Sequence, residues 1–294
     1  MAEHSGGKLN RLERTLPAGL LVDAAWMTRN GYSTSLRTQY VAAGWLVQPT
    51  RGTFKRPLGS LTWQNAVVSL QTLLGYPLTV GGRTALELHG FAHYLRANGS
   101  TVVHLHGVDA PPGWLFKLPL AERFVFHNSG VLFTSDPVTS DPVMSDPVMS
   151  DPVMADAGQR LREHGGVTAD LLKSGAFKSL REGEWSLVVS SPERALLELL
   201  DELPNDESFH QVDMLVEGLR NLSPGRLQRL LEDCRSVKVK RLLFWFAERH
   251  NHAWLARLDR SRVDLGKGKR MLVKGGKLDR TYLITVPEDL SAPV

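Results

Sequence analysis

"YSTSLRTQYVAAGWLVQPTRGTFKRP", residues 32–57, joins a short helical pattern to a short basic hairpin pattern. Ser33 or Ser35 can cap a helix that ends at Gly44. One face of this helix is apolar and is formed by Leu36, Tyr40 and Val41. The segments "WLVQ" and "GTFKR" then predict two short strands around the turn "PTRG".

Two further short helices are predicted before this segment. Leu9, Leu12 and Leu16 recur at helical spacing, and a second helix begins after the potential N-cap Asp23 and stops near Asn30. Three short helices followed by a hairpin within about sixty residues are typical of a winged helix-turn-helix. We therefore predict this domain for residues 1–60.

The third helix and the hairpin carry the residue types that contact DNA. The apolar face of the helix predicts that its polar residues point outward, where they can meet base edges and phosphates in a major groove. A basic wing beside that helix would contact backbone phosphates. The alternative is that a surface helix is polar and a turn basic by chance, but the order, brevity and charge of the elements favour DNA binding. The predicted DNA-binding residues are Thr34, Arg37, Thr38, Gln39, Arg51, Lys55 and Arg56.

Charge is distributed unevenly along the 294 residues, although the formal net charge is only +4. Residues 1–60 carry a net charge of +5, residues 61–219 carry −10 and residues 220–282 carry +11. Two basic ends that flank an acidic middle indicate polyanionic or acidic partners at either end.

Residues 61–294 mix strand and helix patterns and predict a second domain, so the fold class expected for the whole chain is α+β. "STVVHLHG", "RFVFHN" and "GEWSLVVSS" have the alternation of strands, and "GWLFKLPL" is a further candidate. Helices dominate towards the end, beginning with "SPERALLELLDEL", where Ser191 can be the N-cap and Pro192 the first helical residue. The tail "KRMLVKGGKLDRTYLITVPEDL" predicts two strands around a Gly-Gly turn.

A low-complexity segment interrupts this domain. The unit SDPV(T/M) occurs four times in residues 135–154. Proline every five residues is incompatible with a helix and with sheet pairing, so the segment is predicted to be a solvated loop insertion. The aspartate spacing does not fit a calcium-binding loop.

Histidine pairs at two places have spacings that suit a metal site. His89 and His93 would share a helical face, and His104 and His106 would share a strand face. The alternative is that these imidazoles are ordinary polar or hydrogen-bonded groups. With no cysteine nearby we favour that alternative, and we expect neither a metal nor a cofactor.

No recognised catalytic motif is present, so the expected function is not enzymatic. The chain lacks the nucleophile-elbow, zinc-protease and phosphate-loop patterns, although "GKGKR" and "KGGK" are glycine-lysine loops. The single cysteine, Cys234, lies at helical spacing from leucines and is predicted to be a core or half-exposed thiol.

The compartment expected from the sequence is the cytoplasm. The N-terminus lacks the apolar core of a secretory signal, and the most apolar stretch is too short and too interrupted to span a bilayer. One cysteine excludes an internal disulfide.

Several long stretches resemble the AbiEi antitoxins of AbiE-type toxin–antitoxin systems. They are "LPAGLLVDAAWMTRNGYSTSLRTQYVAAGWLVQPTRGTFKRP", "LTWQNAVVSLQTLLGYPLTVGGRTALELHGFAHYL", "SPERALLELLDELP" and "CRSVKVKRLLFWFAERHNHAWL". The resemblance implies a bacterial repressor that binds inverted repeats in its own promoter. It also implies an antitoxin that counters a nucleotidyltransferase toxin, AbiEii, directly or indirectly. On this resemblance the family's DNA-contacting helix and wing correspond to Arg37, Thr38, Arg51 and Lys55.

We assign the second basic region, residues 220–282, to neutralisation of the toxin. Because the N-terminal unit already supplies a DNA contact, we expect the C-terminal cluster to grip an acidic toxin face or to compete for the toxin's substrate. A second, nonspecific DNA contact is the alternative. The residues of this cluster are Lys238, Lys240, Arg241, Lys267, Lys269 and Arg270.

Two other functions stay open at this stage. The chain could be a one-component repressor whose second domain senses a small molecule, or a nucleotide-handling enzyme with a DNA-binding appendage. A toxin gene immediately downstream would support the antitoxin function. Operator affinity that depends on a ligand would support the one-component repressor, and nucleotide turnover would support the enzyme.

Overall fold

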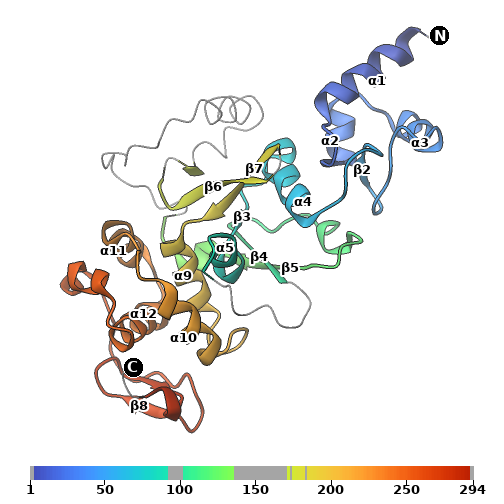
Figure 1. Ribbon diagram of the computed structural model, residues 1–294. Coiled ribbons are helices and arrows are strands. Elements are labelled where there is room, and N and C mark those ends of the chain that lie inside the picture. Colours follow the sequence, from blue (N-terminus) through green and yellow to red (C-terminus); the bar gives the residue numbers. More distant parts are fainter. Residues whose placement is uncertain (1–2, 92–101, 136–170, 173, 183, 292–294) are drawn as a thin grey trace.

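The computed structural model describes residues 3–91, 102–135, 171–172, 174–182 and 184–291. An N-terminal unit lies at one end of the molecule, a mixed sheet in the middle and a group of helices at the other end (Figure 1). The predicted α+β class is confirmed. All but the first residue of the SDPV repeat, as well as His93, lies outside the described residues.

The N-terminal unit has the predicted three helices and a wing. α1 spans Glu3–Thr15, α2 spans Ala24–Arg29 and α3 spans Thr34–Ala42. The side chains of Asp23 and Ser33 cap α2 and α3 by accepting hydrogen bonds from Trp26 N and Leu36 N, so these two helix starts are confirmed.

The wing differs from the predicted hairpin in its first strand. β2, Thr53–Lys55, pairs antiparallel with β1, Leu21–Asp23, which precedes the helices. The predicted strand over residues 45–48 is reduced to one bridge between Val47 and Lys55. Strand β2 is therefore held on both sides, which fixes the turn that carries Arg51.

A five-stranded mixed sheet forms the middle of the molecule. Its order is β5-β4-β3-β7-β6, with β3/β7 and β4/β5 parallel and β3/β4 and β6/β7 antiparallel. The strands are β3 (Thr79–Val80), β4 (Val102–Gly107), β5 (Arg123–Asn128), β6 (Phe177–Glu182) and β7 (Trp185–Ser190). The candidate strand "GWLFKLPL" is wrong, because Leu115–Lys117 form a 3-10 helix.

The helix after the wing joins the N-terminal unit to this sheet. α4, Trp63–Ser69, is capped by Thr62 and continues as a π-helical turn over Leu70–Leu74. Ser69 Oγ accepts a hydrogen bond from Leu21 N at 3.0 Å. The buried Gln71 amide donates to Leu78 O and Val188 O at 2.8 and 2.9 Å and so ties the π-helical turn to the sheet.

The later helices of the described residues lie either beside the sheet or at the C-terminal end of the molecule. α5 (Gly82–Leu88) and α6 (Ser129–Leu132) follow strands directly, and α9 (Pro192–Asp201), α10 (Phe209–Gly218), α11 (Pro224–Asp233) and α12 (Val237–Arg249) gather at the C-terminal end (Figure 1). Ser191 caps α9 with Pro192 at its first position, as predicted. Cys234 is buried as expected, and burial raises the pKa of its thiol to about 11.

The C-terminal hairpin is displaced from its predicted position. β8 (Lys277–Asp279) pairs antiparallel with β9 (Ile284–Val286), so the turn lies at residues 280–283 and not at Gly275-Gly276. Ile284 and Val286 are buried and fix this register. Short 3-10 turns at Ala253–Arg257, Arg260–Arg262 and Glu288–Leu290 complete the region.

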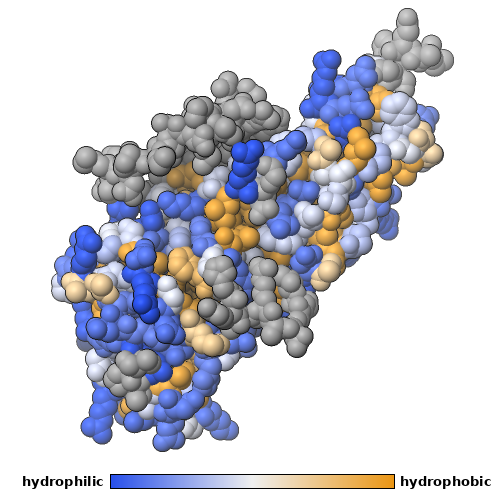
Figure 2. Space-filling model, in the orientation of Figure 1, coloured by the Kyte–Doolittle hydropathy of each residue, from blue (hydrophilic) through white to orange (hydrophobic). Residues whose placement is uncertain are grey.

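The surface is predominantly hydrophilic over the C-terminal elements, and hydrophobic residues form small patches on the N-terminal unit and beside the sheet (Figure 2). Within the described residues, no helix is both long and apolar enough to cross a membrane.

Candidate functional site

One side of α3 presents polar side chains to solvent. Thr34, Ser35, Thr38 and Gln39 are exposed, and Arg51 is exposed at the tip of the wing. The burial of Tyr40 orients the helix, because residues on the opposite side then face outward. These exposed residues provide hydroxyl and amide groups on a helix next to a basic turn.

Arg37 does not belong to this face, and its predicted outward orientation is wrong. Its side chain is 8% exposed, and its guanidinium donates to Ala24 O and Thr34 Oγ1, both at 2.8 Å. It also lies over the Phe54 ring, with 5.8 Å to the ring centroid. The physical reason is helical spacing: Arg37 is three residues before buried Tyr40 and shares its face. Arg37 therefore joins α3 to α2 and the wing.

The predicted DNA contact by Lys55 is also wrong, because this side chain faces the interior of the N-terminal unit. Its side chain is buried, and its ammonium donates to Arg56 O and Gly59 O at 2.8 and 2.9 Å. Burial lowers the pKa of this ammonium. The neighbouring Arg56 is half-buried and turned towards α1, where it lies 3.6 Å from a carboxylate oxygen of Glu13. Of the predicted basic wing residues, only Arg51 is exposed without such an ion pair.

The predicted C-terminal cluster is divided between the interior and the surface. Lys240 and Arg241 are buried, so they cannot be part of an exposed basic face. Arg241 donates to Leu265 O and Gly268 O, both at 2.7 Å, and thereby holds the loop after the 3-10 turns. Lys238 is half-buried and donates to Leu203 O at 2.8 Å.

Three members of that cluster remain on the surface. Lys267, Lys269 and Arg270 are exposed and follow one another in the loop that Arg241 holds. They therefore form a compact positive patch on an anchored loop.

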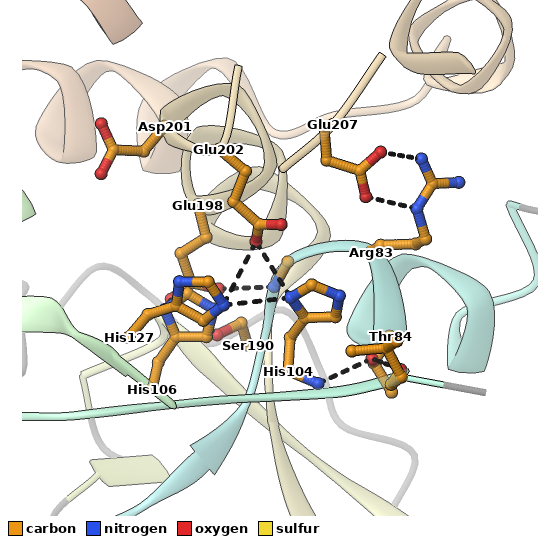
Figure 3. A network of polar contacts seen from close by, with 12 residues as sticks. Arg83, Thr84, His104, His106, His127, Ser190, Glu198, Asp201, Glu202 and Glu207 are labelled. Atoms are coloured by element: carbon orange, nitrogen blue, oxygen red, sulfur yellow. Dashed lines mark hydrogen bonds and ion pairs between the residues drawn. The ribbon is translucent and has the colours of Figure 1, made fainter. Parts of the chain in front are cut away.

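A second group of polar residues meets in the interior, between the sheet and α9 (Figure 3). His104 and His106 lie on β4, and His127 lies on β5 directly beside His106 in the strand register. The alternation of a strand places His104 and His106 on the same face. Glu198 lies on α9 and Glu202 is the C-cap residue of the same helix, so the two are four residues apart and approach from one side. We call these five residues the histidine–glutamate cluster.

Three atoms of this cluster converge. His104 Nδ1 lies 3.1 Å from His127 Nε2 and 3.2 Å from Glu202 Oε1. His127 Nε2 lies 3.7 Å from the same carboxylate oxygen. Among the described residues, neither carboxylate oxygen of Glu202 nor Nε2 of His106 has a partner in hydrogen-bond geometry, although all three atoms are buried. Buried polar atoms in this state are uncommon in proteins.

Glu198 has a different role in the cluster, because its carboxylate is fully hydrogen-bonded. It accepts hydrogen bonds from Gly82 N at 2.9 Å, Ser190 Oγ at 3.0 Å and Arg194 Nε at 2.8 Å. These contacts tie α9 to the start of α5 and to β7. Burial and neighbouring positive groups lower the pKa of His106 well below its ordinary value, so its ring is neutral at physiological pH.

The cluster borders a cavity of about 150 Å³. His127 and Glu202 line it, together with Asp201 and Asp206. Outside the cluster, Arg83 on α5 forms an ion pair with Glu207. His89 is separate from the cluster and contacts Ser190 O at 2.9 Å through its Nε2 atom.

The sequence indicates only part of this cluster. The spacing of His104 and His106 predicts a shared strand face, whereas His127, Glu198 and Glu202 are distant in the chain and no local pattern connects them with these two histidines. The four-residue spacing of the two glutamates on an amphipathic helix is the one local signal that could have indicated them.

Two family profiles match the chain. Residues 5–97 match "Transcriptional regulator, AbiEi antitoxin N-terminal domain", and residues 160–287 match "Transcriptional regulator, AbiEi antitoxin, Type IV TA system". Together they cover more than half of the sequence. The chain belongs to the AbiEi antitoxin family. The resemblance inferred from the sequence is thus confirmed, and the chain is a member of a family of transcriptional regulators and antitoxins of type IV toxin–antitoxin systems.

The fold is also similar to a solved structure. The crystal structure of the RV2827C protein from Mycobacterium tuberculosis has a TM-score of 0.52 and 14% identity to this AbiEi family member, over 97% of this chain and 91% of that one. At this identity the similarity concerns the fold alone. A comparison with curated proteins finds no match.

Proposed function

We propose that this protein represses its own operon by binding promoter DNA through the N-terminal unit and that its C-terminal domain neutralises a nucleotidyltransferase toxin. The observation that carries the first part is the exposed polar face of α3 beside the exposed Arg51. The family membership supports both parts.

The proposed DNA contacts differ from those expected from the sequence. Thr38 and Gln39 are the candidates for base contacts, because they are exposed near the middle of α3 and a glutamine amide can pair with the edge of an adenine. Thr34 and Arg51 are the candidates for phosphate contacts. Arg37 and Lys55 are left out because they are buried.

Titration against the native promoter at several salt concentrations tests this proposal. Gln39→Ala is expected to cost about 1–3 kcal/mol and to relax sequence preference. Arg51→Ala is expected to weaken binding to all sequences and to reduce the salt slope by about one. Arg123→Ala removes an exposed arginine far along the chain on β5 and is the matched control. Wild-type binding by both the Gln39 and the Arg51 variant would refute the proposed interface.

The proposed toxin contact is confined to Lys267, Lys269 and Arg270. Their charges are exposed and lie on a loop anchored by two hydrogen bonds from Arg241, so a partner would meet a preformed positive patch. Such a patch could bind an acidic face of the toxin or compete for its nucleotide or RNA substrate. Nonspecific DNA binding by the same patch is the competing hypothesis.

Co-expression with the adjacent gene product separates these possibilities. Reversing Lys267, Lys269 and Arg270 to glutamate is expected to abolish rescue of growth while a specific promoter complex still forms. The control reverses Lys117, Arg123 and Lys178, which are exposed elsewhere and give the same change in net charge. Full rescue combined with lost promoter binding would assign the patch to DNA.

A further inference from the structure

We propose that His104, His127 and Glu202 form a binding site for a divalent transition metal of the zinc class, with a fourth coordination position open to the adjacent cavity. The inference rests on the histidine–glutamate cluster (Figure 3) and is independent of the proposed DNA and toxin contacts.

The spacing of the three atoms fits one shared ion. His104 Nδ1, His127 Nε2 and Glu202 Oε1 are separated by 3.1, 3.2 and 3.7 Å. The point in their plane that is equidistant from all three lies about 1.9 Å from each, and a tetrahedral ion slightly above the plane would lie about 2.1 Å from each. Zinc in proteins is bound at about 2.0–2.2 Å by histidine nitrogens and carboxylate oxygens. The three atoms also lie within 4.8 Å of one another, as ligands of one ion must.

The hydrogen-bonding of the cluster is unfavourable without an ion. One proton between two imidazole nitrogens that face each other makes their mutual hydrogen bond, so that proton does not also serve the Glu202 carboxylate. Glu202 is nearly completely buried, with 2% of its side chain exposed, and no described residue donates to its two oxygens in hydrogen-bond geometry. Burying a carboxyl group in this state is costly. A divalent cation would satisfy the two nitrogens and the carboxylate together.

The surrounding elements hold these ligands in place. β4 and β5 pair in parallel over their full length, which sets the distance between His104 and His127. The backbone of His104 is held as well, because His104 N donates a hydrogen bond to Thr84 Oγ1 at 3.0 Å. Glu202 lies one turn after Glu198, whose three hydrogen bonds fasten α9 to α5 and β7. A site built on sheet and helix in this way is preorganised.

The cavity supplies the remaining coordination position, because two of the three ligands, His127 and Glu202, line it. Asp206 adds an acidic residue to its lining, whereas Asp201, which also lines it, is paired with Lys238 at 3.4 Å. A water molecule or a small anionic ligand in this cavity could complete a tetrahedral shell, as in zinc sites with three protein ligands. Imidazole ligands favour zinc over magnesium or calcium, which prefer oxygen ligands throughout.

Metal analysis of the full-length protein tests the proposal. The protein is stripped with a chelator, dialysed against Zn²⁺ and analysed by mass spectrometry for bound metal, and its thermal midpoint is measured with and without Zn²⁺. We expect about one zinc per chain and an upward shift of a few degrees at saturation. Substitution by Co²⁺ is expected to give the visible spectrum of a tetrahedral site.

Three variants decide the outcome. Glu202→Gln keeps the shape of the side chain but removes its charge, and His127→Ala removes a ligand whose ring is partly exposed. Both are expected to weaken Zn²⁺ binding by more than about tenfold and to abolish the thermal shift. His210→Ala removes an exposed imidazole that pairs with Asp289 and is expected to bind zinc like the wild type.

Absence of stoichiometric zinc in the wild type would overturn the proposal, as would equal zinc binding by all three variants. If Glu202→Gln fails to fold, His127→Ala still gives the decisive comparison with His210→Ala. A wild type without zinc and a Glu202→Gln variant of raised stability would indicate a metal-free cluster with a strained carboxylate.

Discussion

Replacement of Arg37 by alanine is expected to lower the stability of the N-terminal unit and not to remove a base contact. The change deletes two charged hydrogen bonds, to Ala24 O and Thr34 Oγ1, and a cation–π contact with Phe54. Hydrogen bonds from charged groups contribute about 1.5–3 kcal/mol each and an arginine over an aromatic ring about 0.5–1 kcal/mol.

The net loss is smaller than the sum of these contributions. Ala24 O also accepts a hydrogen bond from Thr28 Oγ1, and exposed Thr34 can turn to water, so neither acceptor is left unsatisfied. The arginine side chain loses up to roughly 2 kcal/mol of rotamer entropy when it is fixed in the folded state, and alanine avoids this cost. We therefore expect a destabilisation of about 2 kcal/mol.

Hydrogen exchange along α2 and α3, combined with urea unfolding, measures this effect. The amides of residues 24–42 are expected to lose protection in Arg37→Ala, while those of α12 are unchanged. Thr38→Ala, on the exposed side of the same helix, is the control and is expected to change stability by less than about 0.5 kcal/mol. If Arg37→Ala keeps full stability and loses promoter affinity as Gln39→Ala does, the guanidinium faces DNA and the reasoning from burial is refuted.

Three further substitutions test other parts of the fold. Glu198→Ala is expected to destabilise the protein by about 3–5 kcal/mol in urea unfolding, because it breaks a buried ion pair with Arg194 and removes the acceptor of Gly82 N and Ser190 Oγ; a loss below about 1 kcal/mol would contradict this. Arg241→Ala is expected to raise protease cleavage in residues 265–270, because the hydrogen bonds to Leu265 O and Gly268 O are lost; an unchanged cleavage pattern would argue against the anchoring role. The raised pKa of Cys234 means that the unfolded chain loses this proton from about pH 9 while the folded chain holds it until about pH 11. Stability should therefore fall as pH rises through this window, by about 2–3 kcal/mol at most, and the fall should be smaller in Cys234→Ala; identical pH profiles would contradict the assignment.

The local signals in the sequence were sufficient for the helices and their starts. Asp23, Ser33 and Ser191 all cap the helices that they were expected to cap. Capping depends on a side chain and amides only two or three residues away, so it is readable from a short segment. The winged helix-turn-helix followed from the order of such segments.

The sequence could not determine which polar residues are buried. Arg37, Lys55, Lys240 and Arg241 were expected on the surface because long charged side chains usually lie there. The two arginines are held by partners from another segment, Ala24 for Arg37 and Leu265 for Arg241. An arginine can be buried when backbone carbonyl oxygens accept hydrogen bonds from its guanidinium. Only the tertiary structure decides where those carbonyl groups lie.

The histidine–glutamate cluster shows the same division. Strand alternation already placed His104 and His106 on one face, but the identity of that face and its partners depended on the pairing of β4 with β5 and on the packing of α9 against the sheet. His104 and Glu202 are almost a hundred residues apart in the chain. Periodicity is a local property and specifies the direction of a side chain within its own element. Which side chain comes to face it from another element is set by sheet register and helix packing, and these are fixed only when the whole core is assembled.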